Sequence, residues 1–274
     1  MPRTRDEQAA IERFDTLYAH ARDDFMREIE RSVCGCDYGG TSWTTRAEAD
    51  KVTKKLALAP GRRLLEVGAG SGWPGLYLAK QTGCDVALID LPIEGLRVAR
   101  DRAASDRLAG THWIAQADGT ALPFGDGIFD AVFHSDVLCC LVEKLAVLKA
   151  CRRVASADGR LVFSVVYVTP GLDTNAHALA IAGGPPFVDA SHPYPDLVRQ
   201  AGWTLVNDHD LTDEYLQSTR RHLTGLETHR SEIAATFGVQ DAADMVTKRR
   251  ATVHALEAGT LKRALFEAVP AAAS

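Results

Sequence analysis

The sequence of 274 residues lacks the long apolar segments and the excess of positive charge that characterise several large protein classes. No segment approaches the roughly 20 consecutive apolar residues that a membrane-spanning helix needs. Lysine and arginine total 31 against 36 aspartate and glutamate residues, which gives a net charge of -5. Binding to nucleic acid depends on clustered cations that neutralise phosphates. We therefore expect neither a membrane nor a nucleic-acid partner.

Cysteine is too sparse for a disulfide scaffold, since the chain has only six. Four of them lie in apolar stretches, where a free cysteine behaves as a small hydrophobic residue. The other two, Cys34 and Cys36, have no second ligand pair at zinc-finger spacing, so no metal site is expected. Residues 1–14 contain no apolar segment of a secretory signal. These features predict a reduced, cytoplasmic protein, and a homo-oligomer is compatible with them.

The N-terminal part, residues 1–45, is expected to form a helical cap followed by a lid loop. Between residues 7 and 31 apolar side chains recur at three- and four-residue intervals, the period of an amphipathic helix. A glycine-rich, aromatic loop follows at residues 34–43. Thr45 and Glu48 then fit a capping box, which predicts a second helix from this point to about Leu58.

A different pattern begins after this cap, because short apolar strands alternate with helices. The strand candidates are residues 64–67, 86–89, 111–114, 129–133, 160–167 and 203–206. Such alternation is typical of a parallel sheet that is covered by helices on both faces and joined by right-handed crossovers. Residues 46–210 are therefore expected to form an α/β core. A proline- and glycine-rich insertion at residues 170–195 is expected to lie over the active face.

The last segment, residues 211–274, is expected to add helices to the core. Residues 215–237 and 242–269 are rich in helix-forming residues, and the alanine-rich tail after them is expected to fray. No internal repeat or low-complexity linker divides the chain, so we expect a single domain with additions at both ends.

The first strand ends in a glycine loop, Gly68-x-Gly70-x-Gly72, which opens the next helix. Glycines there permit positive φ angles and close approach of a ligand, and the helix N-terminus supplies free N–H groups. The loop alone does not identify its ligand. Read from Gly70 to Gly75, it also fits the dinucleotide-binding pattern, with Asp90 at the position of a ribose-binding acid. An NAD(P)-dependent oxidoreductase and a glycine turn without any ligand therefore stay as alternatives.

Three further features favour a methyl donor over a dinucleotide. Glu66 lies two residues before the first glycine, the third strand ends at Asp118-Gly119, and the fourth begins with Phe129-Asp130. In this combination the sequence resembles the class I S-adenosylmethionine-dependent methyltransferases. Members of that family combine an acid before the glycine loop, acids after the second and third strands, and a Phe-Asp-x-Val strand.

The resemblance covers roughly residues 38–168. It departs from the family pattern at residues 157–159, where Ala-Asp-Gly replaces the usual Pro-Gly-Gly. It implies a Rossmann-like, doubly wound, mostly parallel seven-stranded sheet, with S-adenosylmethionine as the cofactor and S-adenosylhomocysteine as the product. It also implies a small-molecule acceptor, because the similarity is greatest to small-molecule methyltransferases.

The same resemblance assigns roles to individual residues. Backbone atoms of the glycine loop are expected to lie against the methionine part of the donor, Asp90 to hold the ribose hydroxyls, and Asp118 the adenine amino group. Tyr38 or Trp43 is expected to close the sulfonium end. The residues assigned to the cofactor are Tyr38, Glu66, Gly68, Ala69, Gly70, Asp90, Leu91, Asp118, Gly119, His134 and Ser135. His134, at the end of the fourth strand, is also the candidate general base, since imidazole titrates near neutrality.

Each of these side chains also has a purely structural interpretation. Asp90 fits an N-cap, Asp118 a turn before glycine, and Glu66 a carboxylate that only orients loop amides. Tyr38 and its neighbour Trp43 fit aromatic contacts that hold the first helix against the sheet. His134 fits a structural histidine of the interior.

Methyl transfer itself requires positioning and water exclusion rather than a nucleophile, and a base only where the acceptor must lose a proton. The sequence leaves open whether oxygen, nitrogen or carbon accepts the methyl group. A non-catalytic binding protein on the same fold is the remaining alternative, although such a protein would be expected to lack the glycines or acids that are present here.

Overall fold

The computed structural model describes residues 3–38 and 41–272 as one seven-stranded sheet with helices on both faces and across one end. The strands lie in the order β3-β2-β1-β4-β5-β7-β6. Their bounds are β1 Arg63–Val67, β2 Asp85–Asp90, β3 His112–Gln116, β4 Phe129–Ser135, β5 Ala155–Val168, β6 Trp203–Asp210 and β7 Leu261–Pro270. The first five strands pair in parallel, and β7 pairs antiparallel with both β5 and β6. The predicted doubly wound, mostly parallel α/β fold is confirmed.

Two hydrophobic clusters fill the two faces of the sheet. One face packs against α3 (Arg46–Lys55), α4 (Gly75–Thr82) and α5 (Ile93–Asp106), through buried residues such as Val52, Leu76 and Ala99. The other packs against α6 (Lys144–Val154) and α8 (Tyr194–Gln200), through residues such as Leu148 and Val198. Adjacent residues along a strand point to opposite faces, so a buried strand contributes to both clusters.

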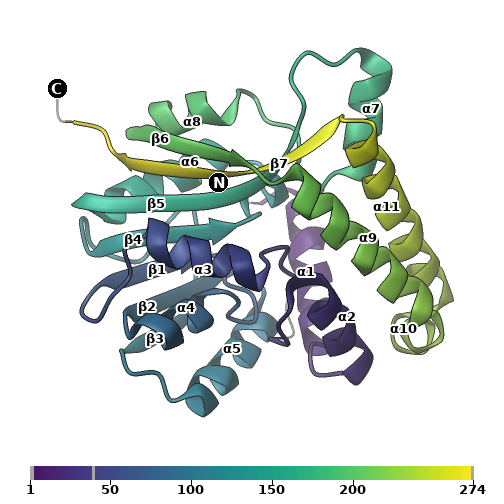
Figure 1. Cartoon of the computed structure of the whole chain (residues 1–274), viewed down its shortest axis with the longest axis horizontal. Coiled ribbons are helices and arrows are strands. Elements are labelled where there is room, and N and C mark those ends of the chain that lie inside the picture. The colour runs from purple at the N-terminus through teal and green to yellow at the C-terminus, as the bar shows by residue number, and fades with distance from the viewer. Residues whose placement is uncertain (1–2, 39–40, 273–274) are drawn as a thin grey trace.

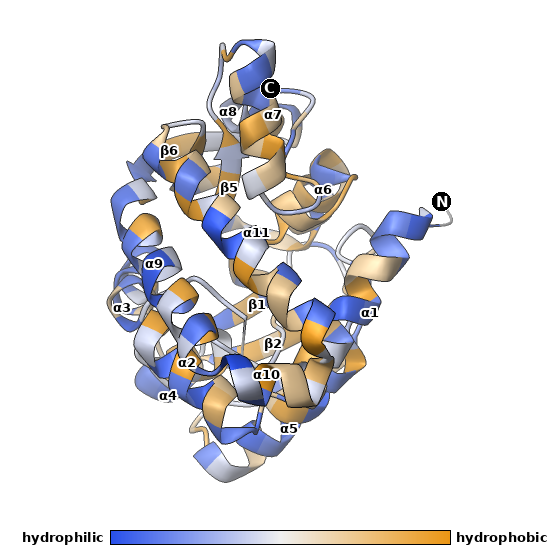
Figure 2. Cartoon of the chain, turned by 90° about the vertical axis from the view of Figure 1, so that its right-hand side faces the viewer, coloured by the Kyte–Doolittle hydropathy of each residue, from blue (hydrophilic) through white to orange (hydrophobic). Residues whose placement is uncertain are grey.

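The remaining helices gather at one end of the sheet, at the right of Figure 1. They are α1 (Arg5–Ala19), α2 (Asp24–Cys34), α7 (Thr174–Gly183), α9 (Thr212–Thr228), α10 (Arg230–Phe237) and α11 (Val239–Glu257). A third cluster, which includes Ile29, Val33, Leu226 and Ile233, joins α2 to α9 and α10. Seen from this end, the cap helices are arranged around β1 and β2 (Figure 2). They therefore cover the carboxyl ends of the parallel strands, where open α/β sheets bind ligands.

The C-terminal segment contains a strand that the sequence did not predict. Residues 261–270 form β7 instead of continuing the helix expected over residues 242–269. The segment Leu-Lys-Arg-Ala-Leu-Phe-Glu-Ala-Val consists mostly of good helix formers, but β7 pairs with β5 from Leu261 opposite Val168 to Ala268 opposite Leu161. Pairing and burial between two strands override intrinsic propensity here. β7 also supplies the seventh strand, which no sequence pattern located.

Two smaller differences concern helices. The single N-terminal amphipathic helix expected over residues 7–31 is two helices, α1 and α2, separated at residues 20–23. The insertion at residues 170–195 contains α7, which packs along α11. Among the described residues no helix is both long and apolar enough to cross a membrane.

Candidate active site

The glycine loop after β1 has the strained backbone that its sequence predicted. Gly68, Gly70 and Gly72 have φ angles of 71°, 50° and 92°. The Gly68 and Ala69 N–H groups donate to the carbonyl of Ile89 in β2, at 2.8 and 3.0 Å. A Cβ atom at Gly68 would lie 2.3 Å from Cγ2 of Val137. The loop therefore requires glycine both for its conformation and for its close approach to the segment after β4.

Glu66 lies buried beneath this loop. Its Oε2 accepts a hydrogen bond from the N–H of Gly75, the first residue of α4, at 3.0 Å. Burial raises the pKa of this carboxyl well above its ordinary value. A Cβ atom at Gly75 would lie 2.1 Å from Oε2, so the contact is close. This geometry suits a group that orients the amides of the loop and the helix, the structural interpretation considered above.

Asp90 joins the end of β2 to the glycine loop. Its Oδ2 accepts from the Gly70 N–H and its Oδ1 from the Leu91 N–H, both at 2.7 Å. Burial raises the pKa of Asp90 to about 6, against the opposing effect of these two donors. Asp90 does not cap the next helix, because the N-cap of α5 is Pro92. Each carboxylate oxygen retains a lone pair, so the group can accept further hydrogen bonds at the strand end.

Asp118 follows β3 and lies next to the N-terminus of α1. Its Oδ2 accepts from Nη2 of Arg3 at 2.6 Å, and its Oδ1 from the N–H and hydroxyl of Thr120 at 2.9 and 2.8 Å. Burial opposes ionisation, but the donors of Thr120 and Arg3 outweigh it and lower the pKa of Asp118. At Gly119 a Cβ atom would lie 3.0 Å from Val67 of β1, which explains the glycine there.

His134 and Ser135 end β4 but point to opposite faces of the sheet. The Ser135 hydroxyl lies 2.6 Å from that of Thr44, at the start of the helix α3 segment. The His134 ring is fully buried and stacks on Phe163 of β5, with centroids 4.8 Å apart. Neither ring nitrogen has a hydrogen-bond partner within the described part of the chain, and burial lowers the pKa of His134 to about 3. The expected accessible imidazole at the mouth of β4 is thus a buried, neutral ring, because the pleat turns its side chain into the interior.

Tyr38 lies away from the position expected for it. Its ring packs against Trp73 at 5.1 Å, with the guanidinium of Arg102 4.2 Å from its centroid, and its hydroxyl donates to Asp106. Asp106 is the last residue of α5, a helix that starts at the ligand-binding end, so the hydroxyl points toward the opposite edge of the sheet. Tyr38 is therefore not placed to close the sulfonium end. Trp43 packs against Tyr215 and His222 of α9, which matches the alternative of an aromatic contact that holds the cap.

Tyr18, which sequence reasoning missed, covers the glycine loop instead. A Cβ atom at Gly70 would lie 2.3 Å from the Tyr18 hydroxyl, and one at Gly95 would lie 2.9 Å from the Tyr18 ring. The hydroxyl is 3.3 Å from that of Thr41, and burial together with the charge of Asp90 raises the pKa of Tyr18. The helical period placed this residue on the apolar face of the first helix, but nothing in the sequence said what that face covers.

A buried ionic network lies at the end of β4, and no pattern in the sequence predicted it. Arg263 of β7 binds both oxygens of Glu48, at 2.8 and 3.0 Å, and both oxygens of Asp136, at 3.1 Å. Asp136 has a φ of 54°, in the left-handed region. Burial alone would lower the pKa of Arg263, but the two carboxylates raise it. The network fixes the turn after β4 against α3 and β7.

Comparison with known proteins places this arrangement in a family. A family model described as a methyltransferase domain matches residues 65–163, the segment from β1 to β5 that carries the glycine loop, Asp90 and Asp118. A phosphoethanolamine N-methyltransferase of Triticum aestivum is 28% identical over 211 residues, 77% of this chain and 41% of that protein. Residues 65–163 therefore match a methyltransferase domain, as the resemblance to the class I S-adenosylmethionine-dependent methyltransferases implied.

Solved structures agree on the fold of this chain. Phosphoethanolamine N-methyltransferase 2 of Haemonchus contortus, in complex with S-adenosyl-L-methionine, superposes with a TM-score of 0.70 at 17% identity, covering 84% of this chain and 54% of that one. The [4+2]-cyclase SpnF superposes with a TM-score of 0.74 at 22% identity and covers 97% of both chains. The chain spans less than half the length of the phosphoethanolamine N-methyltransferases whose sequences it matches.

The residues at the strand ends fit S-adenosylmethionine, the cofactor of the matched family. The glycine loop lies beside Asp90, which presents two oxygens at the end of β2. Ser71, within the loop, is buried and its hydroxyl has no partner among the residues that the structure describes. Such a group is expected where a ligand completes the hydrogen bonding.

Proposed function

We propose that this protein transfers the methyl group of S-adenosylmethionine to a small, largely apolar organic acceptor and releases S-adenosylhomocysteine. The observation that carries the proposal is the contact between Asp90 and the Gly70 amide, which brings a carboxylate and a glycine loop together at the ends of β1 and β2. Bound S-adenosylmethionine supplies the activated methyl group, and the protein's own groups bind, align and exclude water.

On the donor side, the proposal assigns distinct tasks to three groups. The backbone of residues 68–72 lies against the methionine part of the cofactor. Asp90 accepts from the ribose hydroxyls through its remaining lone pairs. Asp118 accepts from the adenine amino group, next to the donors from Arg3 and Thr120 that already hold its carboxylate in place.

For the acceptor side, the proposal relies on a buried aromatic group on β4, β5 and β7. His134, Phe163 and Phe266 are paired neighbours on β4, β5 and β7, with ring centroids 4.8 and 5.1 Å apart. Tyr194 of α8 packs against both phenylalanines. Its buried hydroxyl, like the nitrogens of His134, has no hydrogen-bond partner in the described structure. Two unsatisfied polar side chains in an apolar setting suit an acceptor with one or two polar atoms on an apolar body.

The cations near this side are already engaged, which favours such an acceptor over a phosphorylated amine like that of the phosphoethanolamine relatives. Arg263 is held by Glu48 and Asp136. Arg249 lies 4.4 Å from the ring centroid of Trp43, and its Nε donates to His222 at 3.1 Å.

Positioning and water exclusion supply the catalysis in this proposal. Methyl displacement from a sulfonium consumes charge, so fixed charges contribute less than alignment, which can be worth about 7–11 kcal/mol. The cap helices and Tyr18 lie over the strand ends and exclude water. With a pKa of about 3, His134 is a weak base, so we assign it to the wall of the acceptor site rather than to proton removal.

Cofactor binding tests the donor side directly. Isothermal titration with S-adenosylhomocysteine should show that Asp90→Asn weakens binding by about 100-fold, because two hydrogen bonds to a charged acceptor are each worth about 1.5–3 kcal/mol. Asp101→Asn, on the exposed pair between Asp101 and Arg22, is the matched control and should bind as the wild type does. Unchanged affinity in Asp90→Asn, or tighter binding of NAD(H) than of S-adenosylhomocysteine, would contradict the assignment.

Transfer from labelled S-adenosylmethionine tests the acceptor side. A panel should include small phenols, aliphatic alcohols and amines, and phosphoethanolamine. We expect incorporation into apolar members and none into phosphoethanolamine. Preference for phosphoethanolamine would refute the apolar acceptor, and cofactor binding without transfer to any compound, in the panel or in metabolite extracts, would refute catalysis.

A further inference from the structure

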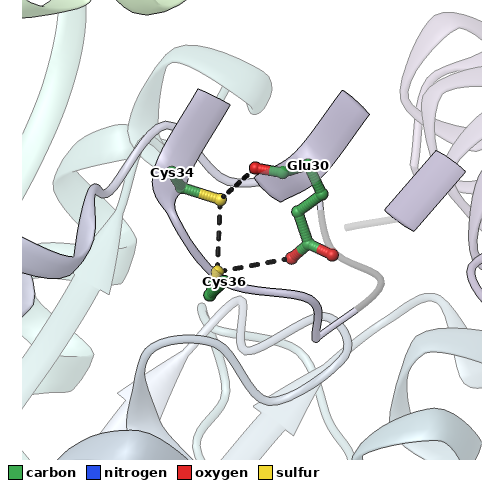
Figure 3. Close-up of side chains that lie close together, drawn as sticks. All are labelled: Glu30, Cys34 and Cys36. Atoms are coloured by element: carbon green, nitrogen blue, oxygen red, sulfur yellow. Dashed lines mark hydrogen bonds between the residues drawn. The ribbon is translucent and has the colours of Figure 1, made fainter. Parts of the chain in front are cut away.

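Three potential metal ligands meet where α2 ends, on a part of the cap that the methyl-transfer proposal does not use. Figure 3 shows Glu30, Cys34 and Cys36 pointing toward one another. The two sulfur atoms lie 3.2 Å apart, and Cys36 Sγ lies 3.6 Å from Oε1 of Glu30. One ligand atom from each of the three residues lies within 4.8 Å of the others.

The local backbone explains why these groups converge. Glu30 and Cys34 are four residues apart on α2, so their side chains share one face of the helix. Gly35, with a φ of 76°, ends the helix in the left-handed conformation and turns Cys36 back toward Cys34. Glu30 and Cys34 are both buried. The Tyr38 N–H donates to Oε1 of Glu30 at 3.1 Å and so orients the carboxylate.

The donor set has the chemistry and dimensions of a zinc site. Thiolates bind zinc at about 2.3 Å and carboxylate oxygens at about 2.0–2.2 Å, in tetrahedral geometry. A tetrahedron with these bond lengths has edges of roughly 3.4–3.8 Å. The observed separations of 3.2 and 3.6 Å need only small adjustments to match them. Two sulfurs disfavour calcium and magnesium, which prefer oxygen ligands.

We propose that Glu30, Cys34 and Cys36 bind one divalent cation of the zinc class, with a fourth position open to water or another ligand. Binding forms two metal–sulfur bonds and one metal–oxygen bond, and the two thiol protons pass to solvent.

The site lies between the cap and the donor side of the protein. Cys36 also lines a cavity of about 400 Å³ together with Tyr38, Trp73 and Arg102, which gives the fourth position a route to solvent. Further along the same segment, the Thr44 carbonyl accepts from Nε1 of Trp73, and the Thr44 hydroxyl contacts Ser135. A metal at Cys36 would therefore fix the start of the segment that reaches the end of β4.

Metal content measures the proposal without reference to enzymatic activity. The full chain, without an affinity tag and kept reduced, is dialysed against buffered zinc and analysed by elemental mass spectrometry. We expect one zinc per chain in the wild type, and a rise in melting temperature with zinc. Cys34→Ser, Cys36→Ser and Glu30→Gln should each weaken zinc binding by more than about tenfold, since ligand geometry sets affinity. Cys84→Ser, at a buried thiol outside the cluster, should bind zinc as the wild type does.

Cobalt substitution provides a second readout that does not depend on stability. Cobalt bound to the wild type should give thiolate charge-transfer absorption, which falls in each cysteine variant and persists in Glu30→Gln at higher cobalt concentration. Circular dichroism confirms that each variant is folded. Less than one tenth of a zinc per chain, equal binding by wild type and both cysteine variants, or a Cys34–Cys36 disulfide in place of metal would overturn the proposal.

Discussion

The donor side and the acceptor side of the sheet end satisfy their buried polar groups in different ways. On the donor side, Asp90 and Asp118 accept from backbone amides, those of Gly70, Leu91 and Thr120. These partners lie in the loops that directly follow the strands, and Arg3 is the one distant side chain that also donates to Asp118 among the described residues. Backbone groups of the strand-end loops therefore provide most of the hydrogen bonds to these two carboxylates.

The acceptor side depends on side chains from distant parts of the sequence. Arg263 binds Asp136 from 127 residues away and Glu48 from 215 residues away. His134 and Tyr194 are buried there with no hydrogen-bond partner in the described residues. A side built from backbone amides suits a fixed cofactor, and a side built from side chains allows a substrate-specific surface. Variants on the donor side should therefore change mainly the affinity for the cofactor, and variants on the acceptor side mainly the free energy of unfolding.

The largest effect is expected from Arg263→Met, which leaves Glu48 and Asp136 buried without their cation. Breaking a buried ion pair on one side costs about 3–5 kcal/mol of unfolding free energy. Urea denaturation measures this loss. Arg250→Met, on an exposed pair with Glu227, is the control and should cost less than about 1 kcal/mol. Equal losses in the two variants would show that the acceptor side does not depend on its long-range network.

The next largest effect is the pH dependence of cofactor affinity on the donor side. Since Asp90 has a pKa of about 6, the carboxylate that accepts from the cofactor is lost as pH falls through this value. Affinity for S-adenosylhomocysteine should be constant above about pH 7 and roughly tenfold weaker at pH 5. Titration calorimetry across this range measures it, with Asp90→Asn as the control that lacks the step.

The ionisation of Asp90 should affect folding stability in the opposite direction: stability should fall over the pH range in which cofactor affinity rises. The folded-state pKa of Asp90 lies above the ordinary aspartate value of 3.8, so the folded protein retains this proton between about pH 4 and 6. The contribution of Asp90 to stability therefore falls as pH rises through that window. A difference between wild type and Asp90→Asn in the pH dependence of unfolding would reveal it. Donor affinity that is flat from pH 5 to 8 would refute the role of Asp90.

The same contrast explains which features the sequence could predict. The glycine loop, Asp90 and Asp118 follow from short-range patterns, because each residue's partner lies nearby in the chain or at the same strand end. The alternation of strands and helices from Arg63 to Tyr167 was equally local. The path of the loop at residues 34–43 does not follow from local patterns. Tyr38 was therefore expected at the cofactor, although it lies against Trp73 and Arg102.

Long-range features had no such signal. β7 consists of helix-forming residues and becomes a strand only because β5 and β6 flank it. Nothing in the sequence links Arg263 to Glu48. The expectation of no metal site rested on the absence of a second cysteine or histidine pair, and it overlooked Glu30, one helical turn before Cys34. The orientation of His134 depends on strand register, which the sequence pattern did not resolve.

A smaller effect is expected from His134→Leu on the acceptor side. Replacing a buried imidazole without partners by an apolar side chain removes a desolvation penalty, so we expect unfolding free energy to rise by about 1 kcal/mol. The shape of the pH–rate profile should stay that of the wild type, because a ring with a pKa of about 3 does not titrate in the working range. Urea denaturation and the pH dependence of kcat measure the two outcomes. Loss of stability would contradict the absence of a hydrogen-bond partner for the ring, and loss of a titration step near neutrality would favour His134 as the general base.

The smallest effect is expected from Tyr18→Phe, which separates the ring that covers the glycine loop from its hydroxyl. The hydroxyl makes one long contact, 3.3 Å to Thr41, so its removal should change donor affinity by less than about threefold. Tyr18→Ala removes the ring from above Gly70 and Gly95 as well, and should weaken the donor more than Tyr18→Phe does. Calorimetry with S-adenosylhomocysteine ranks the two variants. If the ring shields the donor, the order is wild type, Phe, Ala. If Ala binds more tightly than wild type, the ring instead competes with the cofactor for the loop, and the donor side would share with the acceptor side a dependence on a distant side chain.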